Sequence, residues 1–111
     1  MWSVHYDRRL EEWRETIPPD IKARILRIVD MVVEFGPQNV KEPYVKHLKG
    51  HRKLYEMRAK GKDGIARIFY FTWHGQKIVL LHGFIKKSMK TPQKEIDVAV
   101  YRMREVIKWL N

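Results

Sequence analysis

Two arginines stand inside the two most strand-like runs of the chain, and they restrict how these runs can fold. Residues 53–60 and 65–73 flank the turn sequence GKDG, as in a β-hairpin, yet they contain Arg58 and Arg67. A guanidinium stays charged in any surroundings, so burying one without a partner is costly. Each arginine therefore either pairs with a carboxylate or is held for an anionic ligand. Glu56, two residues before Arg58 and on the same side of the strand, is the first candidate for such a pair.

The length and composition indicate one globular domain, residues 1–111. A chain of 111 residues can bury one modest core, and 44% hydrophobic with 32% charged residues is typical of a folded protein. The sequence contains no cysteine, which excludes disulfides and thiolate metal sites. No basic-then-apolar leader opens the chain, and no apolar run approaches the length of a membrane span. We therefore expect a soluble, cytoplasmic protein that has no membrane partner.

Apolar periodicity predicts the element order β-α-α-β-β-β-α. Alternation marks the strands, recurrence at helical spacing marks the helices, and Gly and Pro fall between them. The expected strands are residues 2–6, 53–60, 65–73 and 77–85, and the expected helices are residues 7–16, 20–36 and 91–110. Residues 36–52 are expected to form a loop. We predict a single α+β domain, in which an antiparallel sheet is packed by an N-terminal helical hairpin and a C-terminal helix.

The charge of the chain indicates a polyanionic partner. Lys and Arg total 23 against 13 acidic residues, which gives a net charge of +10 and a pI near 10.0. Residues 41–62 hold eight basic side chains against two acids, and residues 86–94 hold four against none. A single lysine is ordinarily a solvated surface residue. The clustering as a whole favours nucleic acid, an anionic membrane or an acidic protein as the partner.

The strand register is expected to bring several cations to one face of the sheet. If the dipeptides DG and HG are two-residue turns, Arg67 opposes Lys60 on one side and His82 on the other. Arg58 then lies on the same face, and the strand that carries His82 leads into Lys86-Lys87. We expect these cations to gather at one end of the sheet without a neutralising acid.

The alternative for this set is ordinary structural pairing. Arg58 and Arg67 would then be bound by Glu56, Asp63 or a helix carboxylate, and His82 would be a half-buried ring with a partner. His47 and His51 are four residues apart but lie in a basic segment expected to be a loop, and no carboxylates cluster with them, so we expect no metal and no cofactor. The sequence also has no glycine-rich phosphate loop of a known kind.

A sheet lined with cations is suited to phosphate, the anion that forked guanidiniums fit best. A site that only holds a nucleic-acid backbone is a binding module, whereas catalysis also requires stabilised transition-state charge and proton transfer. RNA offers a route without a metal, because its 2′-OH can attack the adjacent phosphorus. Arginines would stabilise charge on the non-bridging oxygens, and a lysine or His82 would transfer protons.

Two segments, KLYEMRAKGKDGIARIFYF and KIVLLHGFIKKSMKTPQKEIDVA, resemble the RelE/ParE toxin superfamily, and more specifically its HigB-like, phage-derived branch. The resemblance covers residues 44–100 closely. It implies a RelE-like microdomain in a type II toxin–antitoxin system, with a cognate antitoxin that is often a helix-turn-helix DNA-binding protein. It also implies an endoribonuclease that cuts mRNA, usually in the A site of the ribosome.

By position, the resemblance assigns the contacts with scissile RNA to Arg58 and Arg67, and the basic residue after the last strand to Lys86 or Lys87. The chain departs from the best-known ribonucleases at Glu56, where some relatives have a lysine, and no tyrosine follows closely after Lys87. The expected catalytic residues are Arg58, Arg67, Lys86, Lys87 and His82. The expected RNA-binding residues are Lys49, Lys53, Lys60, Lys62 and Lys90.

We therefore expect a toxin that is a metal-independent endoribonuclease, acts on mRNA at the ribosome and arrests growth. Two alternatives stay open. One is a gyrase poison of the ParE kind, which needs no convergent cations. The other is a non-catalytic RNA- or ribosome-binding module, for which Tyr55, Tyr70 and Trp73 are available to stack on bases, although strand aromatics more often pack in the core.

Overall fold

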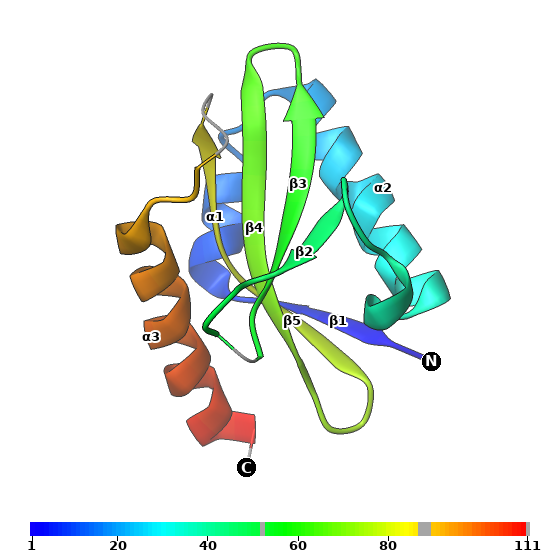
Figure 1. The fold of residues 1–111 in the computed structure, drawn as a ribbon, viewed down its shortest axis with the longest axis vertical. Helices are drawn as coiled ribbons and strands as arrows, with labels where there is room; N and C mark the ends of the chain where they lie inside the picture. Colours follow the sequence, from blue (N-terminus) through cyan, green and yellow to red (C-terminus); the bar gives the residue numbers. More distant parts are fainter. Residues whose placement is uncertain (52, 87–89, 111) are drawn as a thin grey trace.

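A mixed β-sheet with helices on both faces forms the protein (Figure 1). The computed structural model describes residues 1–51, 53–86 and 90–110, and within them the sheet has five strands in the order β1-β5-β4-β3-β2. The strands are β1 (Ser3–Tyr6), β2 (Val45–His47), β3 (Tyr55–Gly61), β4 (Gly64–Trp73) and β5 (Lys77–Lys86). The helices are α1 (Arg8–Arg14), α2 (Pro19–Phe35) and α3 (Gln93–Leu110), with a short 3₁₀ turn η1 (Pro37–Asn39) after α2. In this described part of the chain, no helix combines the length and apolar character needed to cross a membrane.

The predicted α+β class is confirmed, but the sheet differs from the prediction in two ways. β1 pairs in parallel with β5, so the sheet is mixed rather than antiparallel. Residues 36–52, expected to form a loop, contain β2, which pairs with the first part of β3. A three-residue strand is too short to show alternation, and the alternation of residues 2–6 does not indicate which strand they pair with. Neither feature could therefore be predicted from local pattern.

The first two helices begin and end at residues with suitable local chemistry. Asp7 caps α1, since its carboxylate accepts a hydrogen bond of 2.9 Å from the backbone N–H of Arg9. Pro19 occupies the first turn of α2, where a missing N–H costs nothing. Gly36 ends α2 with a φ of 89°, which few other residues adopt.

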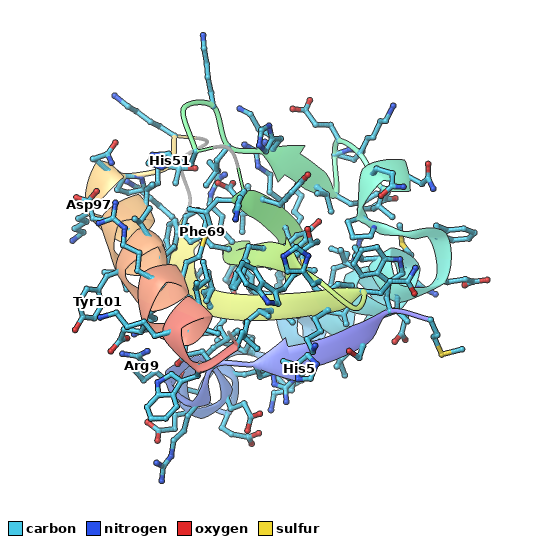
Figure 2. The ribbon with its side chains drawn as sticks, turned by 90° about the horizontal axis from the view of Figure 1, so that it is seen from below. His5, Arg9, His51, Phe69, Asp97 and Tyr101 are labelled. Atoms are coloured by element: carbon cyan, nitrogen blue, oxygen red, sulfur yellow. The ribbon has the colours of Figure 1, made fainter. Side chains whose placement is uncertain are left out.

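Both faces of the central strand β4 are buried, so the core has two layers. Ile68 and Tyr70 face the layer formed with α1 and α2, whereas Phe69 and Phe71 face the layer formed with α3. Phe69 lies inside the molecule beside α3, and Tyr101 points outward from α3 (Figure 2). Because neighbouring residues of a strand point to opposite faces, Arg67 lies on the α3 side with Phe69.

The register between β3 and β4 differs from the predicted one. The turn consists of residues 62–63, one residue earlier than predicted. As a result Arg58 lies directly opposite Arg67, and Lys60 lies opposite Ile65 rather than Arg67. The displacement of Lys60 is two residues along β4, so Lys60 remains on the predicted face.

The register between β4 and β5 also differs, because the turn has three residues and a β-bulge follows at Leu81. Arg67 lies opposite Phe84, and His82 lies opposite Phe69, so the predicted pairing of Arg67 with His82 is wrong. The extra turn residue and the bulge each shift the pairing by one residue. Together they shift the pairing by two residues, and a shift by an even number leaves each side chain on the same face of the sheet. Arg67 and His82 therefore share a face as predicted.

Gly83 on β5 is required by the close approach of α1. A Cβ atom at Gly83 would lie 2.5 Å from Cζ3 and 2.9 Å from Cε3 of Trp13. We predict that Gly83→Ala lowers the free energy of unfolding by about 1–3 kcal/mol, measured by urea denaturation, because the indole ring must shift. Combining it with Trp13→Leu should cost less than the sum of the two single changes. Additive costs would contradict this contact.

Candidate functional site

Three rows of side chains cover the α3-facing side of β3, β4 and β5. Directly opposed residues of neighbouring strands share a face, so the pairings define each row. From the centre of the sheet towards the β3–β4 turn, the rows are Glu56, Phe69 and His82, then Arg58, Arg67 and Phe84, then Lys60, Ile65 and Lys86. The register thus brings four of the expected site cations, from three strands, to one end of this face.

The carboxylate of Glu56 lies at the centre of this face, with no exposed surface. Its Oε1 accepts hydrogen bonds from Arg58 Nε at 2.9 Å and Arg67 Nη1 at 2.6 Å, and its Oε2 accepts one from the Thr91 hydroxyl at 2.8 Å. Burial alone would raise the pKa of Glu56. The bonds from Arg58, Thr91 and Arg67 outweigh burial and hold that pKa below its usual 4.5, so the carboxylate is ionised at neutral pH.

The expectation that Arg58 and Arg67 gather without a neutralising acid is therefore wrong. Glu56 pairs with both of them, as the structural alternative required. Arg67 is completely buried, which leaves its guanidinium inside the protein rather than on a ligand-binding surface. Two guanidiniums and one carboxylate still carry a net charge of +1. The group remains cationic, and Arg58 is the arginine that reaches its surface.

The guanidinium of Arg58 is bound to the protein through its Nε, whereas its Nη side is partly exposed. Its Nε donates to Glu56, and 19% of its side chain is exposed. In the described part of the chain, this leaves both Nη groups for a ligand. β2 pairs with β3 only as far as Met57, and the Arg58 N–H then donates to the Tyr44 carbonyl at 2.8 Å. The rest of β3 forms an open edge there.

A cavity of about 340 Å³ lies along this open edge, and we call it the β3-edge cavity. Its lining residues are Arg24, Pro43, Tyr44, Arg58, Lys60 and Ile65. Three of these side chains are cations and none is acidic. The cavity is therefore suited to an anion that a guanidinium fork can bind.

Sequence reasoning missed Arg24 and Tyr44. Arg24 lies on the polar side of α2, where it reads as an ordinary solvated residue, and Tyr44 lies in the segment expected to be a loop. α2 packs against β3, so its polar flank comes beside the β3 edge. The sequence feature that could have indicated Arg24 is the basic flank of an amphipathic helix. This feature points to a site only when the strand beside the helix is known.

The other expected RNA-binding lysines do not share one site. Lys62 is exposed in the β3–β4 turn, Lys49 in the loop between β2 and β3, and Lys90 in the segment before α3. Lys53 lies near the opposite end of β3, with its Nζ 5.1 Å from the centre of the Trp73 ring. Lys87 lies outside the described residues.

His82 is a half-buried ring with a partner on α3. Its Nε2 lies 3.1 Å from Glu95 Oε1, and its ring stacks on those of Phe69 and Phe84. A carboxylate only accepts hydrogen bonds, so Nε2 carries the proton and Nδ1 is the acceptor of the neutral ring. Burial lowers the pKa of His82 below 6.5, although Glu95 opposes that shift, and the ring is neutral at pH 7. Among the described residues, no cluster of three or more metal-ligating side chains is found.

Removing the negative charge of Glu56 should destabilise the protein strongly. We predict that Glu56→Gln lowers the free energy of unfolding by about 3–5 kcal/mol, because two guanidiniums then lose their carboxylate in a buried setting. The matched control is Glu12→Gln on the exposed side of α1, which should change stability by less than about 0.5 kcal/mol. Equal urea midpoints for the two variants would contradict the role of Glu56.

The same carboxylate should make the fold sensitive to acid. Because the folded-state pKa of Glu56 lies below 4.5, its contribution is complete above pH 4.5 and is lost as the pH falls through the folded-state value. Below pH 4.5, we therefore predict that the unfolding free energy changes less steeply with pH in Glu56→Gln than in the unmodified protein. Parallel slopes would show that Glu56 does not titrate on unfolding.

Comparisons with known proteins agree with this architecture. Residues 12–104 match the family model described as phage-derived protein Gp49-like. No curated protein sequence gives a significant match. A mutant of the Escherichia coli toxin RelE in the free state aligns with a TM-score of 0.65 at 13% identity, over 91% of this chain and 96% of that chain. An archaeal RelE–RelB complex from Pyrococcus horikoshii OT3 contains a chain that aligns with a TM-score of 0.57 at 23% identity, over 76% of this chain and 93% of that chain.

The two structural matches bear on the resemblance found in the sequence. They confirm a RelE-like fold, whereas the HigB-like branch stays a prediction that neither match tests. The family model covers most of the chain, from the second half of α1 into α3. The protein therefore belongs to the Gp49-like family of phage-derived proteins and has the RelE fold.

Proposed function

We propose that the protein is the toxin of a type II toxin–antitoxin system and that it is an endoribonuclease that cleaves mRNA without a metal ion. The RelE fold and the Gp49-like family support the toxin assignment. The observation that carries the ribonuclease assignment is the β3-edge cavity. There Arg24, Arg58 and Lys60 surround a space of about 340 Å³ that no acidic side chain lines among the described residues.

The cavity lining suits a phosphodiester. A guanidinium offers parallel, charge-assisted hydrogen bonds to two phosphate oxygens, and Arg58 presents its Nη groups while Glu56 holds its Nε. Arg24 approaches from α2, which gives a second guanidinium a different direction of approach. Tyr44 is 39% exposed, and its ring can provide a flat surface for a ribose or a base.

RNA supplies the nucleophile for cleavage at this phosphate. The 2′ oxygen bonds to phosphorus and the bond from phosphorus to the 5′ oxygen breaks, which leaves a 2′,3′-cyclic phosphate and a 5′-hydroxyl end. A base takes the 2′-OH proton, and an acid gives a proton to the departing 5′ oxygen. Negative charge grows on the non-bridging oxygens in the transition state, where Arg58 and Arg24 would stabilise it.

Lys60, Lys86 and His82 are the candidates for proton transfer in this proposal. Lys60 and Lys86 lie in one row of the sheet on either side of Ile65, so their ammonium groups can flank the substrate. The neutral His82 ring offers Nδ1 as a base, while its other nitrogen is held by Glu95. Lys87, the other expected catalytic lysine, lies outside the described residues and is not assigned a position.

Arg67 acts through Glu56 in this proposal. Its guanidinium is buried and bound to Oε1, where it offsets the negative charge of Glu56. The charge of Arg58 is then available to the substrate. Glu56 and Arg67 are therefore positioning residues, and of the two strand arginines Arg58 is the one that touches RNA.

The proposed partners are mRNA, the ribosome and an antitoxin, all in the cytoplasm. One structurally similar protein was solved as a RelE–RelB complex, which supports an antitoxin for this chain. A net charge of +10 favours an acidic antitoxin segment that competes with RNA for the cationic face. A helix-turn-helix antitoxin is the form we expect, and it would also bind DNA.

Arg58→Ala provides the sharpest test of this function. We predict that it slows cleavage of translated mRNA about 100-fold or more and prevents growth arrest, because a donor to the transition-state charge is lost. The fold should survive, since Arg67 and Thr91 still bind Glu56. The control is Arg104→Ala on the exposed side of α3, which removes one positive charge elsewhere and should keep full activity.

The products also separate this function from its rivals. Mapping RNA 5′ ends after induction should reveal new cuts that follow the codon phase of translated mRNA. DNA damage without new RNA ends would indicate a gyrase poison instead. Intact mRNA together with salt-sensitive ribosome binding would indicate a non-catalytic module. Either result, or a fully active Arg58→Ala variant, would contradict the proposal.

A further inference from the structure

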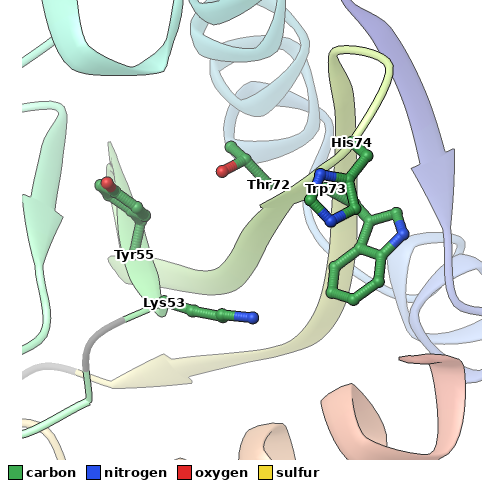
Figure 3. Close-up of a pocket in the computed structure, with 5 residues that line it drawn as sticks. All are labelled: Lys53, Tyr55, Thr72, Trp73 and His74. Carbon is green, nitrogen blue, oxygen red and sulfur yellow. The ribbon is translucent and has the colours of Figure 1, made fainter. Parts of the chain in front are cut away.

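A second cavity lies at the other end of β3, where β4 runs on past its neighbour. β3 begins at Tyr55, which pairs with Tyr70, so residues 71–73 of β4 have no partner on β3. The resulting notch has a volume of about 360 Å³ (Figure 3). It is lined by Lys53, Tyr55, Thr72, Trp73 and His74. None of these residues lines the β3-edge cavity, and no mechanism described above uses them.

Two aromatic rings of this cavity pack against rings of the core. Trp73 makes an edge contact with Phe71, at 6.1 Å between ring centres and 76° between planes. Tyr55 stacks on the buried Tyr70, at 5.3 Å and 20°. A ring that is already held in place loses little conformational freedom when a ligand stacks on it. Tyr55 also contacts His47, at 5.0 Å between ring centres, so Trp73 is the ring of this cavity on which a flat molecule can stack.

The charge of the cavity indicates what kind of flat molecule it accepts. The Nζ atom of Lys53 lies over the Trp73 ring, 5.1 Å from its centre, so a base that stacks on this face takes the place of the ammonium and leaves it next to the base. Thr72 lies between Tyr55 and Trp73 with its hydroxyl in the cavity, where it can hydrogen-bond to a base (Figure 3). No carboxylate belongs to the lining among the described residues. A planar group attached to an anion fits these features.

We propose that this cavity is a nucleobase subsite, in which one base of single-stranded RNA stacks on Trp73 and a neighbouring phosphate contacts Lys53. The inference rests on the proposed function, because the RNA is the substrate of the same chain. β4 rises about 20 Å between Arg67 and Trp73, so the bound base lies a few nucleotides away from the cleaved phosphate. The subsite therefore contributes to RNA affinity rather than to the chemical step.

Trp73→Leu tests the subsite with a short oligoribonucleotide whose 2′-O-methyl groups prevent cleavage. We expect the dissociation constant, measured by fluorescence anisotropy, to rise about 5- to 150-fold, the range found for the loss of one stacked base. Trp109→Leu is the matched control, because Trp109 is 89% exposed on α3, and its affinity should not change. An oligonucleotide without the stacked base should bind both variants equally weakly.

Cross-linking tests the same subsite without any substitution. Oligonucleotides that carry 5-iodouridine at successive positions should cross-link under light to the peptides that contain Tyr55 or Trp73, and from one position only. This result also decides the matter if Trp73→Leu fails to fold, which circular dichroism would reveal. Cross-links that map elsewhere from every position would overturn the subsite.

The failure of this inference differs from the failure of the proposed function. If the unmodified protein cleaves RNA and Trp73→Leu binds the oligonucleotide as tightly as Trp109→Leu, the subsite is wrong and the ribonuclease stands. If the unmodified protein neither cleaves nor binds RNA, both are wrong. Steady-state kinetics distinguish the loss of stacking from damage to the active site. Trp73→Leu should raise KM and leave kcat within about twofold, because it weakens ground-state and transition-state binding equally.

Discussion

One buried carboxylate organises the cationic face of this protein. Glu56 has no exposed surface and accepts hydrogen bonds from Arg58 on β3, Arg67 on β4 and Thr91 in the segment that leads to α3. Without it, two guanidiniums would be close together in a poorly hydrated place, which is costly. With it, the strands and the start of α3 are tied at one point. The Nε of Arg58 is also fixed, so its Nη groups face the β3-edge cavity.

The same arrangement explains how the protein can be stable and cationic at once. Arg67 and Glu56 compensate each other inside the protein, whereas Arg24, Arg58 and Lys60 line a cavity at its surface. The cations that a ligand can reach are thus different from the buried ion pair that stabilises the fold. In the proposed ribonuclease, the buried pair positions Arg58 and the outer cations bind phosphate. The Trp73 cavity would then fix a more distant base of the same RNA.

Much of this architecture could be predicted from the sequence, and the exceptions have physical causes. The helices and the three long strands follow from periodicity, and the shared face of Arg58, Arg67 and His82 follows from strand alternation. The pairing of Arg67 with His82 could not be predicted, because a three-residue turn and a bulge at Leu81 are invisible in the local pattern. Arg24 was missed for a different reason, since only the packing of α2 on β3 brings it to the cavity. Glu56 was recognised as a possible partner of the arginines, but its simultaneous bonds to both depend on the observed register.

In the proposed function Arg58 binds phosphate, while Arg67 stabilises the fold through Glu56. This assignment is tested most directly by NMR of the arginine side chains, labelled with ¹⁵N, during titration with an uncleavable 2′-O-methyl dinucleotide. The guanidinium signals of Arg58 should shift in a saturable manner, whereas those of Arg67 should keep their positions and their slow exchange with water. Saturable shifts confined to Arg67, or binding that leaves Arg58 unchanged, would contradict this assignment.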